Sequence, residues 1–190
     1  MPHSLQDRVF ALPLGFDDAR VARDVPAAHA TVLDLFDAYR DGLYRYVRGM
    51  GTPARDSEDV VQDVFLALFH HLARGGARTN LRGWVFRVAS NMALKRRARE
   101  ARWTRLLTLG GLHLRRETAS SPEDALMHAE RQQRLLAVLQ ALPDRDRQCV
   151  LLRAEGLRYR DIALVLGISL GAVANSLARA LTRLHRADGG

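Results

Sequence analysis

Cysteine is nearly absent from this sequence of 190 residues, which holds only Cys149. A single cysteine cannot form an intramolecular disulfide, and this suits a reducing cytosol. Cys149 stands in an apolar helical run beside Val150 and Leu152, which predicts a packed core residue rather than a redox sensor. Long apolar runs are also missing, and the N-terminus lacks a basic segment followed by an apolar one. Neither secretion nor a membrane span is therefore expected.

Acidic residues are outnumbered, with 21 Asp and Glu against 29 Lys and Arg, for a net charge of +8 and a pI near 10.8. This balance favours an acidic partner, with nucleic acid first and an anionic membrane surface second. Apolar residues make up 47% of the chain, which is enough for packed cores. The length allows one domain or two small ones.

Residues 157–184 are typical of two helices joined by a tight corner. Gly167 can adopt the positive φ of a helix C-terminus, and Ser169 can then cap the next helix. Before the corner, Ile162, Ala163 and Leu166 share one face.

The second of these helices has an apolar and a polar face. The apolar stripe consists of Val173, Leu177, Leu181 and Leu184, which we expect to point inward. The opposite face is expected to carry Asn175, Ser176, Arg179, Thr182, Arg183 and Arg186. This pattern indicates a helix-turn-helix whose second helix lies in the DNA major groove. An ordinary helical hairpin with a solvated basic face is the alternative.

The N-terminal residues 1–30 read as a weakly structured extension, because proline and glycine interrupt them. Helical periodicity begins at Thr31 and ends near residues 49–51. The helix that follows, around 57–72, has two faces. Its inward face consists of Val61, Val64, Phe65, Leu68 and Leu72, and its second stripe of Asp59, Gln62, Asp63 and Leu66. An acidic stripe that ends in leucine resembles a docking surface, although a solvated face gives the same pattern.

A long basic helix follows a polar loop at 74–80 and spans 81–103. Along one face, Arg87, Asn91, Lys95, Arg99 and Arg102 recur at helical spacing. Basic side chains near Trp84 and Phe86 suit single-stranded nucleic acid, because phosphates attract charge and unstacked bases pack on aromatic rings. The alternative makes both aromatic residues core residues, and for Phe86 we prefer it.

The remaining sequence completes an all-α architecture of two small helical domains. Residues 104–121 contain Gly110-Gly111 and a turn-rich stretch, and they read as a flexible linker. The two domains then span 31–103 and 122–188, and the C-terminal one contains the helix-turn-helix.

Three motifs in this order resemble an extracytoplasmic-function sigma factor, the minimal two-domain class of bacterial initiation factor. They are DSEDVVQDVFLALF, NLRGWVFRVASNMALKRRARE and LPDRDRQCVLLRAEGLRYRDIALVLGISLGAVANSLARALTRL. The resemblance covers roughly residues 31–186. It implies that the first domain opens and holds the minus-ten element of a promoter as single strand. It implies that the second domain reads the minus-thirty-five element as duplex, while RNA polymerase core supplies the chemistry.

The resemblance also implies partners and sites. The core-binding residues, at the clamp of the largest catalytic subunit, would be Asp59, Gln62, Asp63 and Leu66; the flap of the second subunit is also an expected partner. The minus-ten residues would be Trp84, Arg87, Asn91, Lys95 and Arg99. The minus-thirty-five residues would be Ser169, Ala172, Asn175, Ser176, Arg179 and Arg183. An anti-sigma factor is a possible further partner. No catalytic residue, metal, cofactor or small-molecule substrate is expected, and the expected location is the cytoplasm.

Two features depart from the family pattern, and two other classes compete with it. At Ala174 and Ser176 the family often carries arginines, and the linker here is net basic where the family is often acidic. A stand-alone helix-turn-helix regulator would explain residues 157–184 but would leave the acidic stripe and the 81–103 helix unused. A metal-dependent nuclease could use Asp59 and Asp63 with His70 or His71, yet no second cluster in the sequence completes its site.

Overall fold

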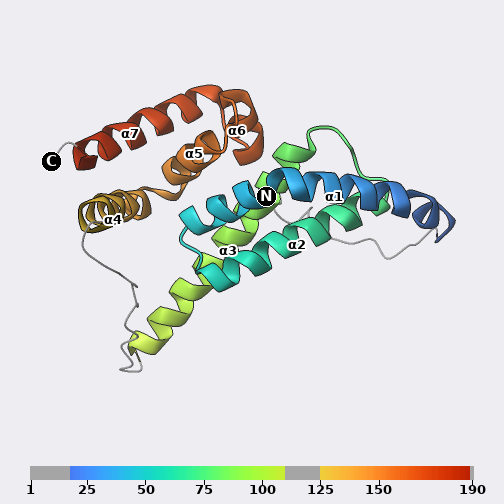
Figure 1. The fold of residues 1–190 in the computed structure, drawn as a ribbon, viewed down its shortest axis with the longest axis horizontal. Helices are drawn as coiled ribbons and strands as arrows, with labels where there is room; N and C mark the ends of the chain where they lie inside the picture. Colours follow the sequence, from blue (N-terminus) through green and yellow to red (C-terminus); the bar gives the residue numbers. More distant parts are fainter. Residues whose placement is uncertain (1–17, 110–124, 189–190) are drawn as a thin grey trace, which may run out of the picture.

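The computed structural model describes residues 18–109 and 125–188, and seven α-helices without any strand make up these two ranges (Figure 1). The helices are α1 (Asp18–Gly49), α2 (Ala54–Ala73), α3 (Leu81–Leu109), α4 (Ala125–Ala141), α5 (Asp144–Ala154), α6 (Tyr159–Leu166) and α7 (Leu170–Asp188). The all-α prediction is confirmed.

Helices α1, α2 and α3 form the N-terminal domain. A short turn at 50–53 returns the chain, so that α2 lies along α1, and α3 packs against both (Figure 1). Phe86 is 1% exposed, which confirms it as a core residue. The predicted inward face of α2 is also confirmed, because Val61, Val64, Phe65, Leu68 and Leu72 are all buried.

Two predicted boundaries of this domain are wrong. Helix α1 begins at Asp18 rather than at Thr31 and continues through Pro26. Proline costs a backbone hydrogen bond inside a helix, but the neighbouring Ala28 is fully buried, and apolar contact with the core offsets that loss. At the other end α3 continues to Leu109, so residues 104–109 of the predicted linker are helical. The remainder of that linker, 110–121, lies outside the described residues.

Helices α4–α7 form the C-terminal domain, in which α7 packs against the other three. Its interior includes Ile162, Val165, Val173 and Leu177, all of them buried. Among the helices described here, none by itself is long and apolar enough to cross a membrane. Helices α6 and α7 together satisfy that test only by length and composition, across a bend of 104°.

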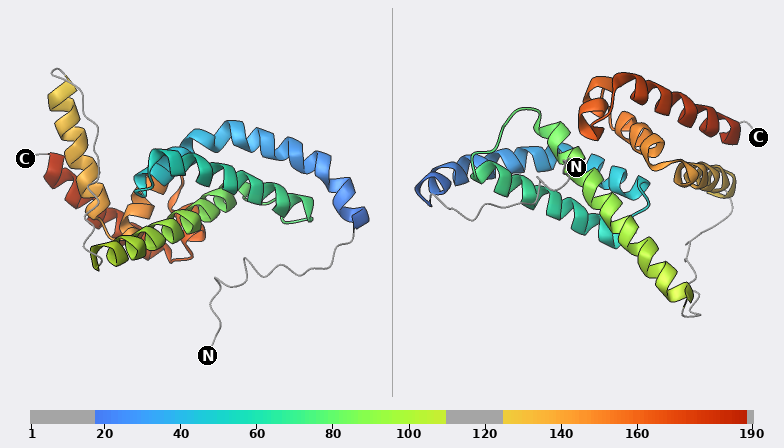
Figure 2. Two further views of the ribbon diagram at one scale, coloured as in Figure 1. Left: turned by 90° about the horizontal axis from the view of Figure 1, so that it is seen from below. Right: turned by 180° about the vertical axis from the view of Figure 1, so that it is seen from behind.

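The two domains lie against each other through α5 and α6 on one side and α1 and α3 on the other (Figure 2). Buried apolar side chains run without a break from Tyr46 and Met50 in the first domain to Cys149 and Leu152 in the second. Cys149 is fully buried, which confirms it as a core residue, and burial raises the pKa of its thiol.

Candidate functional site

The corner between α6 and α7 has the geometry that the sequence predicts. Gly167 adopts φ 66° and ψ 36°, the left-handed conformation that glycine accepts without strain. The N–H of Ile168 donates to the carbonyl oxygen of Ala163 at 3.1 Å, which closes the end of α6. The Oγ of Ser169 accepts a hydrogen bond from the N–H of Ala172 at 3.1 Å and caps α7. The helix-turn-helix prediction is thereby confirmed as local structure.

The exposed face of α7 differs from the predicted one at two positions. Ser176 is fully buried, so its expected place on the exposed face is wrong. Leu181, expected to point inward, is 48% exposed, and Ala180 is buried in its place. The cause is the helical period: from Val173, a residue seven positions on returns within about 20° of the same direction, whereas one eight positions on is rotated by about 80°. Asn175 and Arg183 are exposed as expected.

Arg179 holds α7 against α5 through a two-point ion pair. Its Nε and Nη2 donate to the two carboxylate oxygens of Asp146 at 3.1 and 2.7 Å, and Nη2 also donates to the Oγ of Ser176 at 3.2 Å. The Asp146 side chain is only 3% exposed, whereas that of Arg179 is 55% exposed. The hydrogen bonds from Arg179 hold the pKa of Asp146 below its ordinary value, against the opposing effect of burial.

This pairing changes the interpretation of Arg179. The family resemblance placed Arg179 among the residues that contact the minus-thirty-five element, but two of its donors already serve Asp146 inside the domain. A guanidinium used in this way fixes the orientation of α7 relative to α5. Arg179 is therefore a residue that positions the recognition helix in this arrangement.

We predict that Arg179→Ala destabilises the C-terminal domain. The substitution leaves the Asp146 carboxylate buried without its cation, which is one of the costly classes of single mutation. We expect the melting temperature followed by circular dichroism to fall by about 5 °C or more. The double variant Arg179→Ala, Asp146→Asn should recover part of this loss, because no charge then remains buried. The exposed Arg186 on the same helix provides the control, and Arg186→Ala should leave the melting temperature nearly unchanged.

The effect of Arg179→Ala should depend on pH in one direction. Because the folded-state pKa of Asp146 lies below its ordinary value of 3.8, the stabilisation is complete above that value. It is lost as the pH falls through the folded-state pKa. The difference between wild type and variant should thus be largest near neutral pH and shrink below about pH 4. An equal difference at pH 7 and pH 3 would argue against the ion pair.

The predicted docking stripe on α2 faces outward. Asp59, Gln62, Asp63 and Leu66 are all exposed, and Leu66 is 56% exposed. The carboxylate of Asp59 lies 3.8 Å from Arg96 of α3, and that of Asp56 lies 3.3 Å from the same guanidinium. The stripe is thus an exposed surface, and Arg96 of α3 lies along one edge of it.

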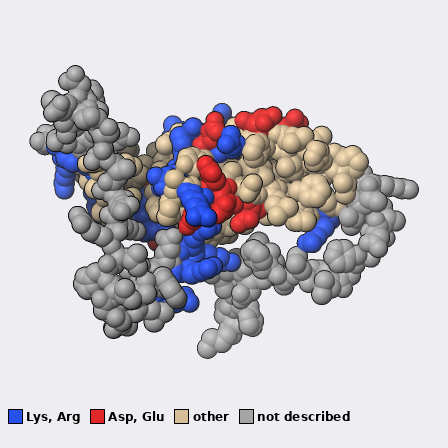
Figure 3. All heavy atoms as spheres, turned by 60° about the horizontal axis from the view of Figure 1, so that its bottom comes forward, with Lys and Arg blue, Asp and Glu red and all other residues tan. Residues whose placement is uncertain are grey.

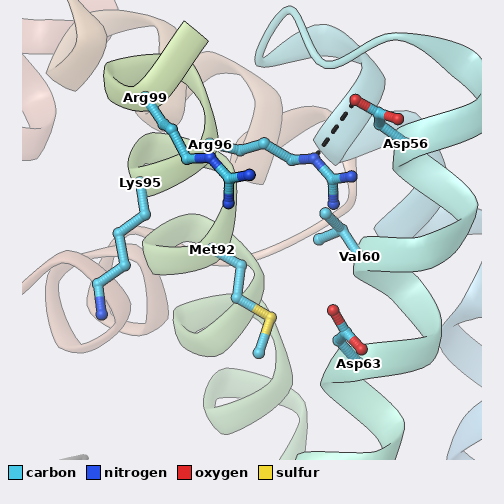
Figure 4. Close-up of a pocket in the computed structure, with 7 residues that line it drawn as sticks. All are labelled: Asp56, Val60, Asp63, Met92, Lys95, Arg96 and Arg99. Carbon is cyan, nitrogen blue, oxygen red and sulfur yellow. Dashed lines mark ion pairs between the residues drawn. The ribbon is translucent and has the colours of Figure 1, made fainter. Parts of the chain in front are cut away.

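A shallow hollow of about 430 Å³ separates this stripe from the basic face of α3. Figure 3 shows acidic and basic side chains gathered side by side on one face of the molecule. In the hollow itself, Arg96 reaches from α3 to Asp56 on α2, and Met92 lies across from Asp63 (Figure 4). Lys95 and Arg99 line the α3 side. The acidic stripe and the basic face therefore adjoin each other but lie on different helices.

The predicted nucleic-acid face of α3 is exposed along most of its length. Arg87, Asn91, Lys95 and Arg99 are all exposed. Trp84 is half-buried and stacks on His71 of α2, with ring centroids 4.9 Å apart. The guanidinium of Arg87 donates to the carbonyl oxygen of Leu164 in α6, so the C-terminal domain reaches one end of this face. Stacking on His71 fixes the ring of Trp84 at the edge of the core.

Sequence reasoning missed the residues that connect the two domains. Glu155 at the end of α5 accepts two hydrogen bonds from Arg45 of α1, and nothing in the local sequence pattern pairs residues so far apart. Within the described parts of the chain, no group of three or more His, Cys, Asp and Glu side chains is arranged to hold a metal ion.

One domain of the protein carries a helix-turn-helix, and the other carries a basic helix beside an acidic stripe. These features are typical of a DNA-binding protein. Comparison with known proteins gives the family. Residues 35–104 match the model of sigma-70 region 2, and residues 132–184 match that of sigma-70 region 4.

Several curated proteins resemble the chain over most of its length. It is 28% identical to the ECF RNA polymerase sigma factor BldN of Streptomyces coelicolor, and the match covers 90% of this chain. The same match covers 66% of BldN, so the chain spans just under two thirds of the length of that relative. It is also 28% identical to the RNA polymerase sigma factor CnrH of Cupriavidus metallidurans, over 94% of this chain and 92% of that one.

Solved structures show the same fold. CnrH in complex with the cytosolic domain of CnrY superposes with a TM-score of 0.63 and 24% identity, covering 90% of this chain and 95% of that one. RpoE of Bartonella quintana, in complex with the anti-sigma factor NepR, gives a TM-score of 0.64 and 19% identity, covering 81% and 94%. The chain belongs to the sigma-70 family, as a two-domain sigma factor of the extracytoplasmic-function class. Its function is promoter-specific initiation of transcription by RNA polymerase.

Proposed function

We propose that the chain divides this function among three surfaces. The α2 stripe binds the polymerase clamp, the exposed face of α3 holds the minus-ten element as single strand, and α7 reads the minus-thirty-five element as duplex. The observation that carries the proposal is the exposure of the α2 stripe and of the α3 face on a chain that also has a helix-turn-helix. A stand-alone regulator needs only the last of these.

The α2 stripe suits a protein partner of opposite charge. Its carboxylates stand next to Leu66, a large apolar side chain that is more than half exposed. An apolar anchor with charged neighbours is a common composition for an interface, in which the apolar group supplies affinity and the charges supply orientation. The clamp of the largest polymerase subunit is the partner that the family membership suggests.

On the C-terminal domain, fewer residues are available to contact duplex DNA than the sequence suggests. Ser169 stands at the exposed N-terminus of α7, followed by the half-buried Ala172 and the exposed Asn175 and Arg183. We assign base and phosphate contacts to these four positions. Arg179 supports them by holding α7 in place through Asp146.

We further propose that the protein has no catalytic activity of its own and acts in the cytoplasm. Its proposed partners, RNA polymerase core and chromosomal DNA, are located there, and the chemistry of RNA synthesis belongs to the polymerase. An anti-sigma factor is a proposed regulator, on the ground that both solved relatives were captured with a second protein.

The proposal is tested by transcription in vitro. The purified chain is added to sigma-free core polymerase with fragmented genomic DNA, and transcript 5′ ends are sequenced. The expected result is a set of start sites, absent without the chain, that share two upstream sequence elements. Core binding without a shared pair of elements would contradict the proposal, and the stand-alone regulator would predict no effect on core at all.

We predict that Asn91→Ala impairs strand opening and leaves the closed promoter complex intact. Asn91 is exposed midway along the α3 face and can hydrogen-bond an unstacked base. Removing a base from the stack costs a few kcal/mol, which pocket contacts must replace. Permanganate reactivity of thymines in the minus-ten element measures the opening. The control is Arg74→Ala, because Arg74 is exposed at the end of α2 and lies outside the three proposed surfaces.

A second measurement separates opening from duplex binding. On a template whose minus-ten region is already single-stranded, Asn91→Ala should still bind less tightly than wild type, because the base contact is lost. A defect confined to binding of the upstream duplex would contradict the assignment of Asn91.

A further inference from the structure

We propose that His71 is a positioning residue for strand opening. It fixes the ring of Trp84 and the loop at 75–80 in one arrangement and acts on DNA only through them. This inference rests on the proposed function, in which the minus-ten surface includes Trp84. His71 itself lies near the end of α2 and belongs to none of the three proposed surfaces.

The imidazole of His71 is stacked on the indole of Trp84. The ring centroids are 4.9 Å apart, and the ring planes are inclined by 27°. Both side chains are half-buried, so the contact lies where the core of the N-terminal domain meets its surface. Aromatic pairs favour particular relative orientations, and His71 therefore limits how far the indole can turn.

The same imidazole is bound to the loop that leads into α3. Its Nε2 lies 3.1 Å from the carbonyl oxygen of Ala77. A carbonyl oxygen only accepts, so Nε2 carries the hydrogen and donates it. The N–H of Gly76 in turn donates to the carbonyl oxygen of His71 at 2.9 Å. His71 thus holds the loop through its ring and through its backbone.

Gly76 is the position at which the loop comes closest to His71. A Cβ there would lie 2.5 Å from Nδ1 of His71 and 2.5 Å from its carbonyl oxygen. Both distances are well inside van der Waals contact, and a backbone oxygen cannot rotate away. A residue without a side chain is therefore required, and the His71 ring contacts the loop as well as Trp84.

The start of α3 sets the backbone of Trp84 independently of His71. The N–H of Trp84 donates to the carbonyl oxygen of Asn80 at 3.0 Å, and the Oδ1 of Asn80 accepts from the N–H of Gly83 at 3.1 Å. Asn80 adopts a φ of 52°, in the left-handed region that asparagine tolerates better than most residues. These bonds locate the backbone of Trp84 but do not choose its rotamer. The orientation of the ring depends on His71.

A fixed indole favours strand opening because an unstacked base needs a replacement surface. A base that leaves the duplex loses its stacking, and an aromatic ring of the protein can restore it. An indole that is already oriented loses little rotamer freedom when the base arrives, so more of the stacking energy is available to stabilise the open strand. Trp84 stands seven positions before Asn91 and shares a face of α3 with it. His71 therefore acts on opening through Trp84.

Three substitutions separate the ring of His71 from its hydrogen bond. His71→Ala removes both, His71→Phe keeps a ring that can stack, and His71→Gln keeps a donor for the carbonyl oxygen of Ala77. The matched control is His70→Ala, because the neighbouring His70 is exposed and its ring lies against Phe69. His70 is one turn beyond Leu66 of the α2 stripe, so all variants are first compared in competition for core. Circular dichroism verifies that each variant keeps its helices.

The functional readout is strand opening by the chain with core polymerase, on a promoter mapped by the transcription experiment above. Permanganate reactivity of the minus-ten thymines should fall with His71→Ala, and the equilibrium constant for opening should drop by about 3- to 10-fold, as expected for the loss of one aromatic pair. His71→Phe should recover most of this loss and His71→Gln a smaller part. The closed complex, footprinted at low temperature, should form equally well with every variant.

Two further measurements distinguish positioning from a general effect on the fold. The chain holds two tryptophans, so a Trp103→Phe background leaves the fluorescence of Trp84 alone. Acrylamide should quench that fluorescence more strongly in His71→Ala than in wild type or His70→Ala. In a Trp84→Ala background, adding His71→Ala should cause no further loss of opening, because the residue through which His71 acts is already gone.

Two outcomes would overturn the inference and leave the proposed function intact. One is equal opening by wild type and a folded His71→Ala, or by His71→Gln if His71→Ala does not fold. The other is a full additional loss when His71→Ala is combined with Trp84→Ala, because His71 would then act by another route. If wild type itself gives no promoter-directed start sites, the proposed function fails and this inference fails with it.

Discussion

Replacing Asp63 with lysine is expected to abolish tight binding of RNA polymerase core. Asp63 is exposed on the α2 stripe, one turn from the exposed Leu66. If the clamp presents basic groups to this stripe, the lysine brings like charges together in a desolvated contact, which costs several kcal/mol. That energy corresponds to a loss of affinity on the order of 100-fold.

The measurement is competition with a labelled sigma factor for core. Asp37→Lys makes the same change of charge on the exposed face of α1, outside the stripe, and should compete like wild type. Because Asp63 lines the hollow beside Lys95, Arg96 and Arg99, the reversal also adds repulsion within the domain. The melting temperature of each variant therefore has to be compared first. Undiminished competition by a folded Asp63→Lys would remove the stripe as a core-binding surface.

The parts of the fold that the sequence predicts well depend on local periodicity. The corner of the helix-turn-helix follows from two residues. Glycine readily accepts the left-handed conformation of Gly167, and the Ser169 hydroxyl caps the N-terminus of α7. The inward face of α2 follows from apolar spacing alone. In both cases the residues that decide the structure are neighbours in the chain.

The errors have physical causes that local patterns do not contain. Residues 1–30 were expected to be a weakly structured extension because proline and glycine interrupt them, but α1 begins at Asp18 and continues through Pro26, close to the buried Ala28. The buried Ser176 accepts a hydrogen bond from Arg179, and Arg179 also donates to Asp146, which lies 33 positions earlier in the chain than Arg179. Arginine on a recognition helix suggests DNA, and only the position of Asp146 shows that it also serves the fold.

The contact between the domains could not be predicted from the sequence either, because it also joins residues that are distant in the chain. Gly42 and Gly49 stand seven apart on α1, and the apolar periodicity gives no sign that a second helix passes over them. The pairing of Arg45 with Glu155 joins residues 110 positions apart. The candidate site residues were predicted from the family motifs, whereas the contacts between the domains were not.

The purified chain alone is expected to bind its promoter duplex weakly, and addition of core should produce a tight complex. In the structure α5 and α6 pack on α1 and α3, so the two readers are in contact. The stretch between Leu109 and Ala125 tethers them. Even fully extended at about 3.3 Å per residue, this stretch spans only about 50 Å.

The two promoter elements are about 70 Å apart, so the domains themselves must supply part of the distance and a scaffold must hold them there. Without that scaffold the avidity of two linked sites is lost, because geometry prevents both from engaging together. The measurement is a gel shift on promoter duplex with and without core, at one fixed salt concentration, since a basic protein binds any DNA when salt is low. A duplex with scrambled elements is the control. Tight binding by the chain alone that distinguishes promoter from scrambled duplex would show that it reads DNA without polymerase, and the three-surface proposal would then fail.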